Sequence, residues 1–259
     1  MTDRDFTIII PAFNDLALLK RALGSVLCQK GTSYDVTVAD DSTTDDIERF
    51  MREEHPSVGY LHNRPSLGAV ANWNRGLEEA TGRYVILMHH DEAMATDGYL
   101  TGIKSHLEQG ADVVVSAIRV FEGDQERKRR FTPSVVRFFL RHPSMLFLAN
   151  PIGPCACVAF RRELLQLFNT RLHWLVDVEW YYRMLRGHTF RYDPSLHILS
   201  IHGHEGQITG SMDTQEVFCE DRKELIRIYS HRPSVRFMLA LQRYGIVWPK
   251  NIIRKIRGK

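Results

Sequence analysis

Several features that mark secreted, membrane-spanning or disulfide-stabilised proteins are missing from this sequence. It has four cysteines in 259 residues, too few to suggest a disulfide framework in a chain of this length. The residues before Phe6 are polar and acidic, and they lack the basic start and long apolar core of a signal peptide. No apolar run approaches the length of a transmembrane helix. These absences predict a cytoplasmic protein with reduced thiols.

The charge balance and the length also limit the function. With 34 Lys and Arg against 31 Asp and Glu, the formal net charge is +3, which does not indicate wholesale nucleic-acid binding. A content of 44% apolar and 25% charged residues is ordinary for a soluble globular protein. The chain is long enough for one α/β domain or two small ones, and it contains no internal repeat.

Strand and helix patterns alternate from residue 6 to about residue 121. Apolar, β-branched runs predict strands at 6–14, 34–42, 58–63, 83–92 and 111–121. Apolar residues at helical spacing predict helices at 15–29, 43–55, 67–82 and 96–110. This alternation predicts an α/β fold, with a mostly parallel sheet covered by helices on both faces.

Polar clusters follow three of the predicted strands: "PAFND", "ADDSTTDD" and "HHDE". Ligands of such sheets bind at the carboxyl ends of the strands. The sequence has no Gly-rich phosphate loop, so a divalent cation held by a carboxylate such as Asp91 would have to neutralise phosphate. The alternative for Asp91 is the N-cap of the next turn. The alternative for His89 and His90 is one ring packed inward and one facing out.

The alternation weakens after residue 121. We expect a charged loop at 122–130, helical segments broken by prolines at 131–150, a strand entering a helix at 155–164 and a helix at 176–187. Cys155 and Cys157 are interpreted as small buried residues on that strand, since no second ligand pair accompanies them. A polar, glycine-rich loop follows at 202–210. We divide the chain into a domain at 1–220 and a basic, helical tail at 221–259.

Five segments in this order resemble the family 2 glycosyltransferases, which have the GT-A fold. "IIIPAFND" is similar to the first strand and turn of the family, and "VADDSTTD" to its D-D-x-S-x-D motif. The segment "NRPSLGAVANWNRGLEEATGRYVILMHHDE" resembles the approach to the D-x-D motif. "VDVEWYYRMLRG" resembles the helix with the E-D motif, and "HGHEGQIT" the closing loop. The resemblance covers residues 6 to about 210.

The resemblance implies a nucleotide-sugar site and a metal, Mn²⁺ or Mg²⁺. The D-x-D motif falls on His89, His90 and Asp91, so Asp91 inherits the metal-ligand role while histidine replaces the first aspartate. His204 is implied as a further group at the metal and diphosphate. The implied nucleotide-sugar contacts are Pro11, Ala12, Phe13, Asn14, Asp40, Asp41, Gly68, Asn72, His89 and His90. Turn chemistry with Ser42 is the alternative for the two aspartates.

The same resemblance implies that Asp177 is the general base of an inverting transfer. Glu179 lies two residues on, so only one of the two carboxylates should enter the site. Trp174, Glu179 and Trp180 are assigned to the acceptor, because aromatic faces stack on sugar rings. A solvated helix face is the alternative for the Asp177 and Glu179 pair.

The predicted activity is that of a hexosyltransferase-type glycosyltransferase, moving a sugar from a UDP-linked donor to a hydroxyl of a glycan or lipid-linked glycan. The alternatives are a sugar-phosphate nucleotidyltransferase and a non-catalytic sugar-nucleotide or glycan-binding protein on the same fold. No nucleic-acid partner is expected. The basic tail either contacts an anionic membrane at its cytoplasmic face or packs on the domain.

Overall fold

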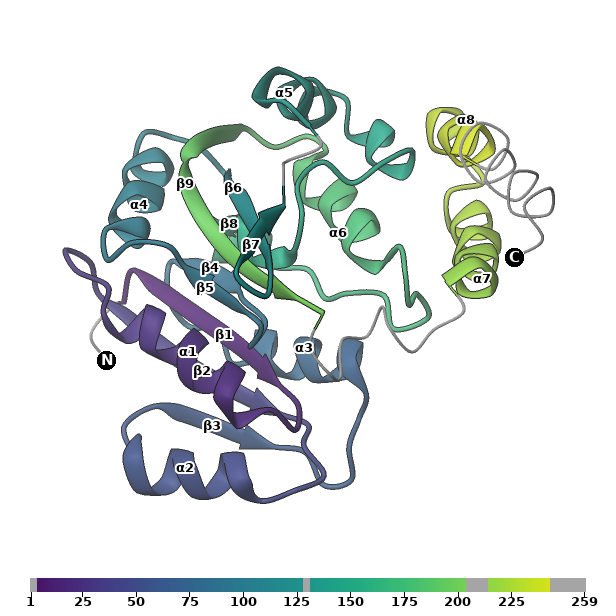
Figure 1. Ribbon diagram of the computed structural model, residues 1–259. Helices are drawn as coiled ribbons and strands as arrows, with labels where there is room; N and C mark the ends of the chain where they lie inside the picture. The colour runs from purple at the N-terminus through teal and green to yellow at the C-terminus, as the bar shows by residue number, and fades with distance from the viewer. Residues whose placement is uncertain (1–3, 128–130, 204–213, 243–259) are drawn as a thin grey trace.

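The computed structural model describes residues 4–127, 131–203 and 214–242 (Figure 1). These residues form one nine-stranded sheet in the order β3-β2-β1-β4-β8-β6-β9-β5, with β7 paired to β6. The strands are β1 (Phe6–Ala12), β2 (Tyr34–Asp40), β3 (Gly59–His62), β4 (Tyr84–Leu87), β5 (Glu92–Met94), β6 (Val113–Glu122), β7 (Gln125–Arg127), β8 (Val158–Arg161) and β9 (Phe190–His202).

The sheet is mostly parallel, as the sequence predicts. Strands β3, β2, β1 and β4 pair in parallel, and β6 pairs in parallel with β9. Strand β8 runs antiparallel between β4 and β6, which leaves these two neighbours pointing the same way. The short strands β5 and β7 are antiparallel to β9 and β6. The carboxyl ends of β1, β2 and β4 therefore meet at one edge.

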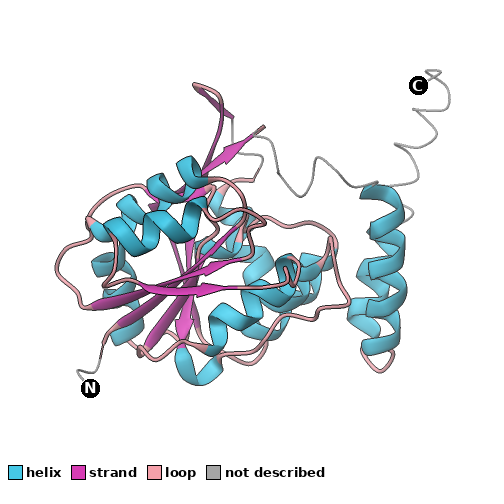
Figure 2. Ribbon diagram, turned by 90° about the horizontal axis from the view of Figure 1, so that it is seen from below, coloured by secondary structure: helices cyan, strands magenta, loops and turns pink. Residues whose placement is uncertain are grey.

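Helices cover both faces of the sheet, which explains why the central strands are continuous apolar runs (Figure 2). All seven residues of β1 are buried. Asp15 caps α1, because its Oδ1 accepts the backbone N–H of Leu18 at 2.9 Å. The helices are α1 (Leu16–Leu27), α2 (Asp46–Glu54), α3 (Ala69–Glu78), α4 (Tyr99–Glu108), α5 (Pro133–Arg141), α6 (Val176–Leu185), α7 (Thr214–Ile228) and α8 (Pro233–Gln242).

Strand β9 is absent from the sequence-based prediction. Its run "FRYDPSLHILSIH" contains Pro194, a residue that argues against a central strand because it has no N–H to donate. The register with β6 accommodates it: Asp193 lies opposite Ser116 and His197 opposite Ala117, so three residues bulge out between them. The irregularity places Pro194 where no ladder hydrogen bond is required.

Two local predictions in the second half need correction. Cys155 and Cys157 are buried as predicted, but they lie in a short 3-10 turn, η2 (Cys155–Cys157), and β8 begins only at Val158. Part of the expected charged loop at 122–130 is β7, which forms a hairpin with β6. The predicted helical segments after it are α5 and the 3-10 helix η1 (Pro143–Phe147), while η3 (Arg162–Leu164) follows β8.

Helices α7 and α8 lie next to each other on the α6 side of the molecule, where α8 packs on η1 (Figure 1). Phe218 and Leu225 of α7 are buried, as are Tyr229 directly after it and Val235 and Leu239 of α8. The predicted division at residue 220 falls inside α7. Among the described residues, no helix has the length and apolar content that crossing a membrane requires.

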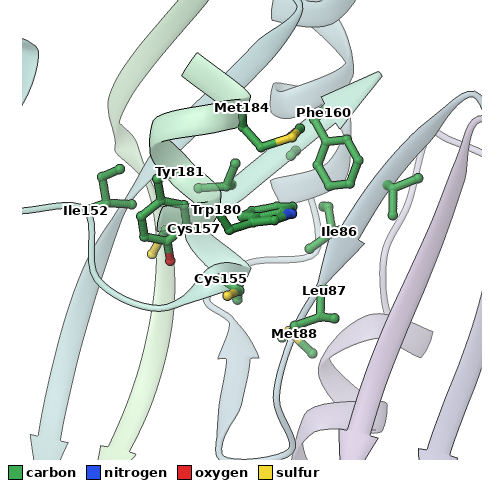
Figure 3. Close-up of a cluster of buried hydrophobic side chains, with 14 of the residues drawn as sticks. Ile86, Leu87, Met88, Ile152, Cys155, Cys157, Phe160, Trp180, Tyr181 and Met184 are labelled. Carbon is green, nitrogen blue, oxygen red and sulfur yellow. The ribbon is translucent and has the colours of Figure 1, made fainter. Parts of the chain in front are cut away.

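The core beneath the site includes side chains from β4, β8, η2 and α6 (Figure 3). Trp180 lies in the middle of this cluster, with Tyr181 on one side and Phe160 and Ile86 on the other. The Trp180 ring stacks on Phe168, with centroids 4.7 Å apart. This packing holds α6 against the sheet.

Candidate active site

The polar clusters predicted at the strand ends do come together. The backbone N–H of His90 donates to the carbonyl of Pro11 at 3.2 Å, which joins the end of β4 to the end of β1. The N–H of Asp41 donates to the carbonyl of Ala12 at 3.0 Å and joins β2 to the same point. These two bonds join residues that are 29 and 79 positions apart in the sequence, so three distant segments share one edge of the sheet.

The first turn exposes one aromatic ring at this edge. Pro11 and Ala12 are buried, whereas the Phe13 side chain is 43% exposed. Asn14 adopts a left-handed conformation with φ of 52°, which Asn tolerates better than most residues. Its backbone N–H donates to Ser42 Oγ, and its Oδ1 accepts the N–H of Thr43. The turn is thus tied to the end of β2 with the Phe13 ring free of the core.

Asp40 and Asp41 are buried and already have protein partners. Asp40 accepts the N–H of Ser42 at 2.9 Å and the hydroxyl of Tyr60 at 2.6 Å. Asp41 accepts hydrogen bonds from the 63–68 segment: Asn63 Nδ2, Ser66 Oγ and the backbone N–H groups of Leu67 and Gly68. Turn chemistry with Ser42 therefore accounts for Asp40. Asp41 fixes the turn before α3, where Gly68 has a φ of 82°.

The assignment of Asn72 to the nucleotide is corrected by its surroundings. The side chain is 2% exposed. Its Nδ2 donates to the carbonyl of Ala39, and its Oδ1 accepts from Asn63, both at 2.8 Å. Both the Nδ2 and the Oδ1 atoms of Asn72 are therefore hydrogen-bonded within the protein. The side chain stabilises the end of β2 and does not face a ligand.

Residues 89–92 form a tight loop between β4 and β5. The backbone N–H of His89 donates to Glu92 Oε2 at 2.8 Å, and His89 Nδ1 lies 3.5 Å from the same oxygen. The His89 ring packs on Trp73, with centroids 4.7 Å apart, while His90 Nδ1 lies 3.2 Å from the carbonyl of Pro11. Neither ring faces fully outward: both histidines are half-buried.

This loop is electrostatically unusual. Burial by itself would lower the pKa of His89, but the carboxylates of Glu92, Asp91 and Asp177 outweigh burial and raise it to about 9. Burial raises the pKa of Glu92, and His89 partly opposes that rise. Burial lowers the pKa of His90. The three neighbouring acidic side chains therefore favour the protonated form of His89.

Asp177 lies on the other side of this loop, in the first turn of α6. Its carboxylate is half-buried and accepts a hydrogen bond from Cys155 Sγ at 3.3 Å. Burial raises the pKa of Asp177, although His89 and the thiol lower it in part. Burial and the Asp177 carboxylate also raise the pKa of the Cys155 thiol, which keeps it a neutral donor. A carboxylate with a raised pKa is suited to accept a proton.

Of the three residues assigned to the acceptor, only Trp174 is exposed. Trp174 is 37% exposed just before the helix, where a ring can be reached from solvent. The assignment of Trp180 is wrong, because its side chain is 0% exposed and packed in the core. The assignment of Glu179 is also wrong, because it is buried on the opposite side of α6, bonded to Arg183 and to the hydroxyl of Tyr229. Only Asp177 faces the strand ends, as the spacing of the two carboxylates predicts.

Three residues near the site were not assigned a role from the sequence: Glu92, Cys155 and Arg21. Arg21 lies on the face of α1 that runs along β5, one turn before Ser25, whose Oγ accepts the N–H of Met94. Burial lowers the pKa of Arg21 and the nearby Asp91 carboxylate raises it. Its Nη1 atom is buried with no hydrogen-bond partner among the described residues. Nothing in the sequence of α1 distinguishes this arginine from a solvated one.

The residues of the loop fit a divalent cation. One ligand atom from each of His89, Asp91 and Glu92 lies within 4.8 Å of the others. His89 Nε2 is buried and has no hydrogen-bond partner in the described part of the chain. Carboxylate oxygen suits Mn²⁺ and Mg²⁺ better than imidazole does, and a protonated imidazole has no free lone pair with which to bind a metal. The chemistry favours Asp91 as ligand; His204, the other predicted group, lies outside the described residues.

Sequence comparison decides the family. The model for glycosyl transferase family 2 matches residues 7–168, more than half of the chain. The chain belongs to this family. It is therefore a glycosyltransferase, and a sugar-phosphate nucleotidyltransferase is not supported.

Relatives within the family cover different shares of the chain. An uncharacterized Mycobacterium tuberculosis protein, MT1568, is 28% identical over 241 residues, which cover 85% of this chain and 72% of that protein. The Campylobacter jejuni GalNAc(5)-diNAcBac-PP-undecaprenol β-1,3-glucosyltransferase is 24% identical over 126 residues, 47% of this chain and 41% of that enzyme. The chain thus spans less than half of the second relative.

Solved structures of other glycosyltransferases share the fold. Staphylococcus aureus TarS in complex with UDP-GlcNAc has a TM-score of 0.63 at 16% identity, covering 86% of this chain and 66% of the TarS chain. The Pyrobaculum calidifontis mannosyltransferase PcManGT, in complex with GDP-Man and Mn²⁺, has a TM-score of 0.63 at 18% identity, covering 99% and 80%. These likenesses confirm the GT-A fold.

Proposed function

We propose that this family 2 glycosyltransferase inverts the anomeric centre, moving a sugar from a UDP-linked donor to a hydroxyl of a glycan or lipid-linked glycan. Asp177 would be the general base, and a divalent cation on Asp91 would hold the donor diphosphate. The observation that carries the proposal is the meeting of Asp177 with the His89–Asp91 loop at the carboxyl ends of the parallel strands.

The base step follows from where Asp177 lies. Its carboxylate would accept the proton of the acceptor hydroxyl while that oxygen attacks the anomeric carbon from the face opposite the diphosphate. The bond to the diphosphate breaks as the new glycosidic bond forms, so the configuration inverts. The raised pKa supports this role, because it gives the carboxylate more affinity for the proton that it takes.

Charge at the leaving group has to be compensated from several directions. Mn²⁺ or Mg²⁺, when bound, would neutralise charge on the diphosphate oxygens. Asp91 would hold the metal, while Arg21 and the His89 imidazolium add positive charge within the same loop region. These fixed cations would lower the free energy of a transition state in which negative charge grows on the diphosphate.

The donor pocket would use the first turn and the end of β2. The exposed Phe13 ring and the backbone of Pro11 to Phe13 would form one wall for the base. Asp40 and Asp41 would contact the base or ribose only if each gave up a hydrogen bond that it now makes within the protein. The TarS structure contains UDP-GlcNAc and the PcManGT structure contains GDP-Man. The similar structures therefore support a donor with either a pyrimidine or a purine nucleotide.

A donor panel tests the proposal. UDP-linked and GDP-linked sugars are incubated with the protein, with and without Mn²⁺, and nucleotide release is measured. We expect metal-stimulated release from a UDP-sugar, and loss of that release in Asp177→Asn. Tight nucleotide binding without any release would favour the alternative of a non-catalytic sugar-nucleotide-binding protein.

The acceptor proposal includes a lipid-linked glycan and a peripheral contact with the cytoplasmic face of a membrane. The name of the C. jejuni relative describes a glucosyltransferase acting on an undecaprenol-linked glycan, which supports this class of acceptor. On α8, Val235 and Leu239 pack inward, while Phe237 and Leu241 are exposed beside Arg236. An exposed apolar and basic helix face suits an anionic membrane.

A further inference from the structure

A buried carboxylate on α7 holds the segment that leads into α6. Asp221 is 0% exposed. Its Oδ1 accepts the backbone N–H of His173 at 3.0 Å, and its Oδ2 accepts those of Trp174 at 2.6 Å and Leu175 at 2.7 Å. Oδ2 also lies 3.1 Å from the N–H of His173. Three consecutive amide groups therefore converge on one side chain from a distant helix.

These bonds fix the three residues that lead into α6. The first N–H groups of a helix have no partner within the helix, and a side chain just before it usually satisfies them. Leu175 holds the N-cap position of α6 and has no polar side chain to do so. Asp221 binds the three amides just before the helix instead, and it places a negative charge near the positive end of the helix dipole. The start of α6 is thereby set by α7.

The segment held by Asp221, residues 173–175, contains Trp174 and leads directly into Asp177, the proposed base. Trp174, the exposed ring assigned to the acceptor, donates its own backbone N–H to Asp221. Asp177 follows two residues after Leu175, in the first turn of the helix. A shift of the 173–175 backbone would therefore move the proposed base and the proposed acceptor platform together.

We propose that Asp221 is a positioning residue for sugar transfer, which aims Asp177 and Trp174 through the amides of residues 173–175. The inference rests on the proposed function. It makes α7 part of the active site, although α7 lies beyond residues 7–168 that the family model matches. Asp221 touches neither donor nor acceptor; it acts through the backbone.

The decisive variant is Asp221→Asn, which keeps the shape of the side chain but removes its charge and one acceptor oxygen. The matched control is Glu224→Gln on the same helix. Glu224 pairs with Arg171 and Arg227 and bonds none of the clamped amides. Both variants are measured for kcat with the UDP-sugar that the wild-type enzyme turns over, for UDP affinity by calorimetry and for thermal unfolding.

We expect Asp221→Asn to lower kcat on the order of 10²-fold, because small displacements of a catalytic group cost about that much. The Kd for UDP should stay unchanged, since the donor pocket is built from β1 and β2. Glu224→Gln should leave both values unchanged. The separation of kcat from Kd distinguishes positioning from a general loss of structure.

Unchanged kcat in a folded Asp221→Asn variant would overturn the inference and leave the proposed function standing. If Asp221→Asn does not fold, Asp221→Glu keeps the charge on a longer side chain and should fold with lowered kcat. If neither Asp221→Asn nor Asp221→Glu folds, Asp221 acts only in stability, and that outcome also overturns the inference. A wild-type protein without turnover of any donor would refute the proposed function, and the inference with it.

Discussion

At the scale of single residues, the two carboxylates of α6 show how burial separates their roles. Asp177 and Glu179 are two positions apart, so their side chains leave the helix in different directions. Asp177 meets Cys155 and the His89 loop, while Glu179 pairs with Arg183 and Tyr229. One position faces the site and the other braces α6 against α7.

We expect Asp177→Asn to reduce turnover on the order of 10²–10⁴-fold, the usual loss when a general base is removed. UDP affinity should be retained, because the change leaves β1 and β2 untouched. In the wild type, the acid limb of kcat/KM should lie above pH 3.8, because burial raises the pKa of Asp177 from that value. Steady-state kinetics across pH measure both effects.

Glu179→Gln is the matched comparison for this prediction. It should lower the temperature of unfolding, because Glu179 is buried in contact with Arg183 and Tyr229, and it should leave kcat within a few-fold. A larger loss of kcat in Glu179→Gln than in Asp177→Asn would reverse the two assignments.

A second prediction concerns His89 and the pH dependence of stability. The folded-state pKa of His89 is about 9, above its ordinary 6.5. The folded protein therefore holds this proton more tightly, so the stabilisation is fully present below pH 6.5 and is lost as pH rises through about 9. Urea unfolding of wild type and His89→Gln should differ most below pH 6.5, and the difference should shrink as the pH rises through about 9.

The Glu92→Gln variant tests the cause of that effect. It removes the carboxylate that contributes most to raising the pKa of His89. The imidazole, followed by NMR, should then titrate at a lower pH than in the wild type. An unchanged titration would mean that Glu92 is not the partner that holds the proton on His89.

At the scale of elements, two glycines illustrate opposite constraints. A Cβ on Gly82, just before β4, would lie 2.5 Å from the carbonyl carbon of Phe6 and 2.6 Å from the nitrogen of Thr7. Both contacts are with the backbone of β1, which cannot move aside without disturbing the sheet. Gly24 lies inside α1, where a Cβ would meet nothing within 4 Å.

We expect Gly82→Ala to destabilise the protein by roughly 1–3 kcal/mol, the usual cost of overpacking. Gly24→Ala should stabilise it by about 1 kcal/mol, because alanine favours the helix interior more than glycine does. The free energy of unfolding in urea measures both. Similar values for the two variants would contradict the close approach of Gly82 to β1.

At the scale of the whole molecule, the open question is what the C-terminal helices contact. The described part of the tail packs on the domain through Val235 and Leu239, yet Phe237 is 58% and Leu241 40% exposed. The predicted tail carries Arg232, Arg236, Arg243, Lys250, Arg254, Lys255, Arg257 and Lys259. Residues from Arg243 onward lie outside the described part of the chain.

We expect the protein to sediment with anionic vesicles more than with neutral ones, and less at high salt. Each Lys or Arg near an anionic surface contributes about 1 kcal/mol, and salt screens that contribution. Replacing both Phe237 and Leu241 by Ser should weaken sedimentation without lowering the unfolding temperature, since neither side chain is in the core.

The control is Leu239→Ser on the packed face of α8, which should lower the unfolding temperature because Leu239 is 0% exposed. Equal, negligible sedimentation of the wild type with both kinds of vesicle would exclude the membrane contact and leave α8 as a packed helix alone.

The sequence alone determined the first half of the fold and the edge at which its polar clusters meet. The runs that form β1, β2 and β4 are short, apolar and β-branched, and their periodicity is a local property. Parallel strands share one carboxyl edge, so the clusters after them had to meet. The different directions of the Asp177 and Glu179 side chains also followed from helical spacing, although which of the two faces the site rested on the family resemblance.

The tertiary structure decided the partners of the site residues, because these come from distant segments. Trp174 and Trp180 are equivalent in type and close in sequence, yet packing against Phe168 buries only the second. Asp221 reaches amides 46 to 48 residues before it, and Cys155 reaches Asp177 across 22 residues. Periodicity records which face of an element is apolar; it does not record which other element covers that face, and that choice is made by packing.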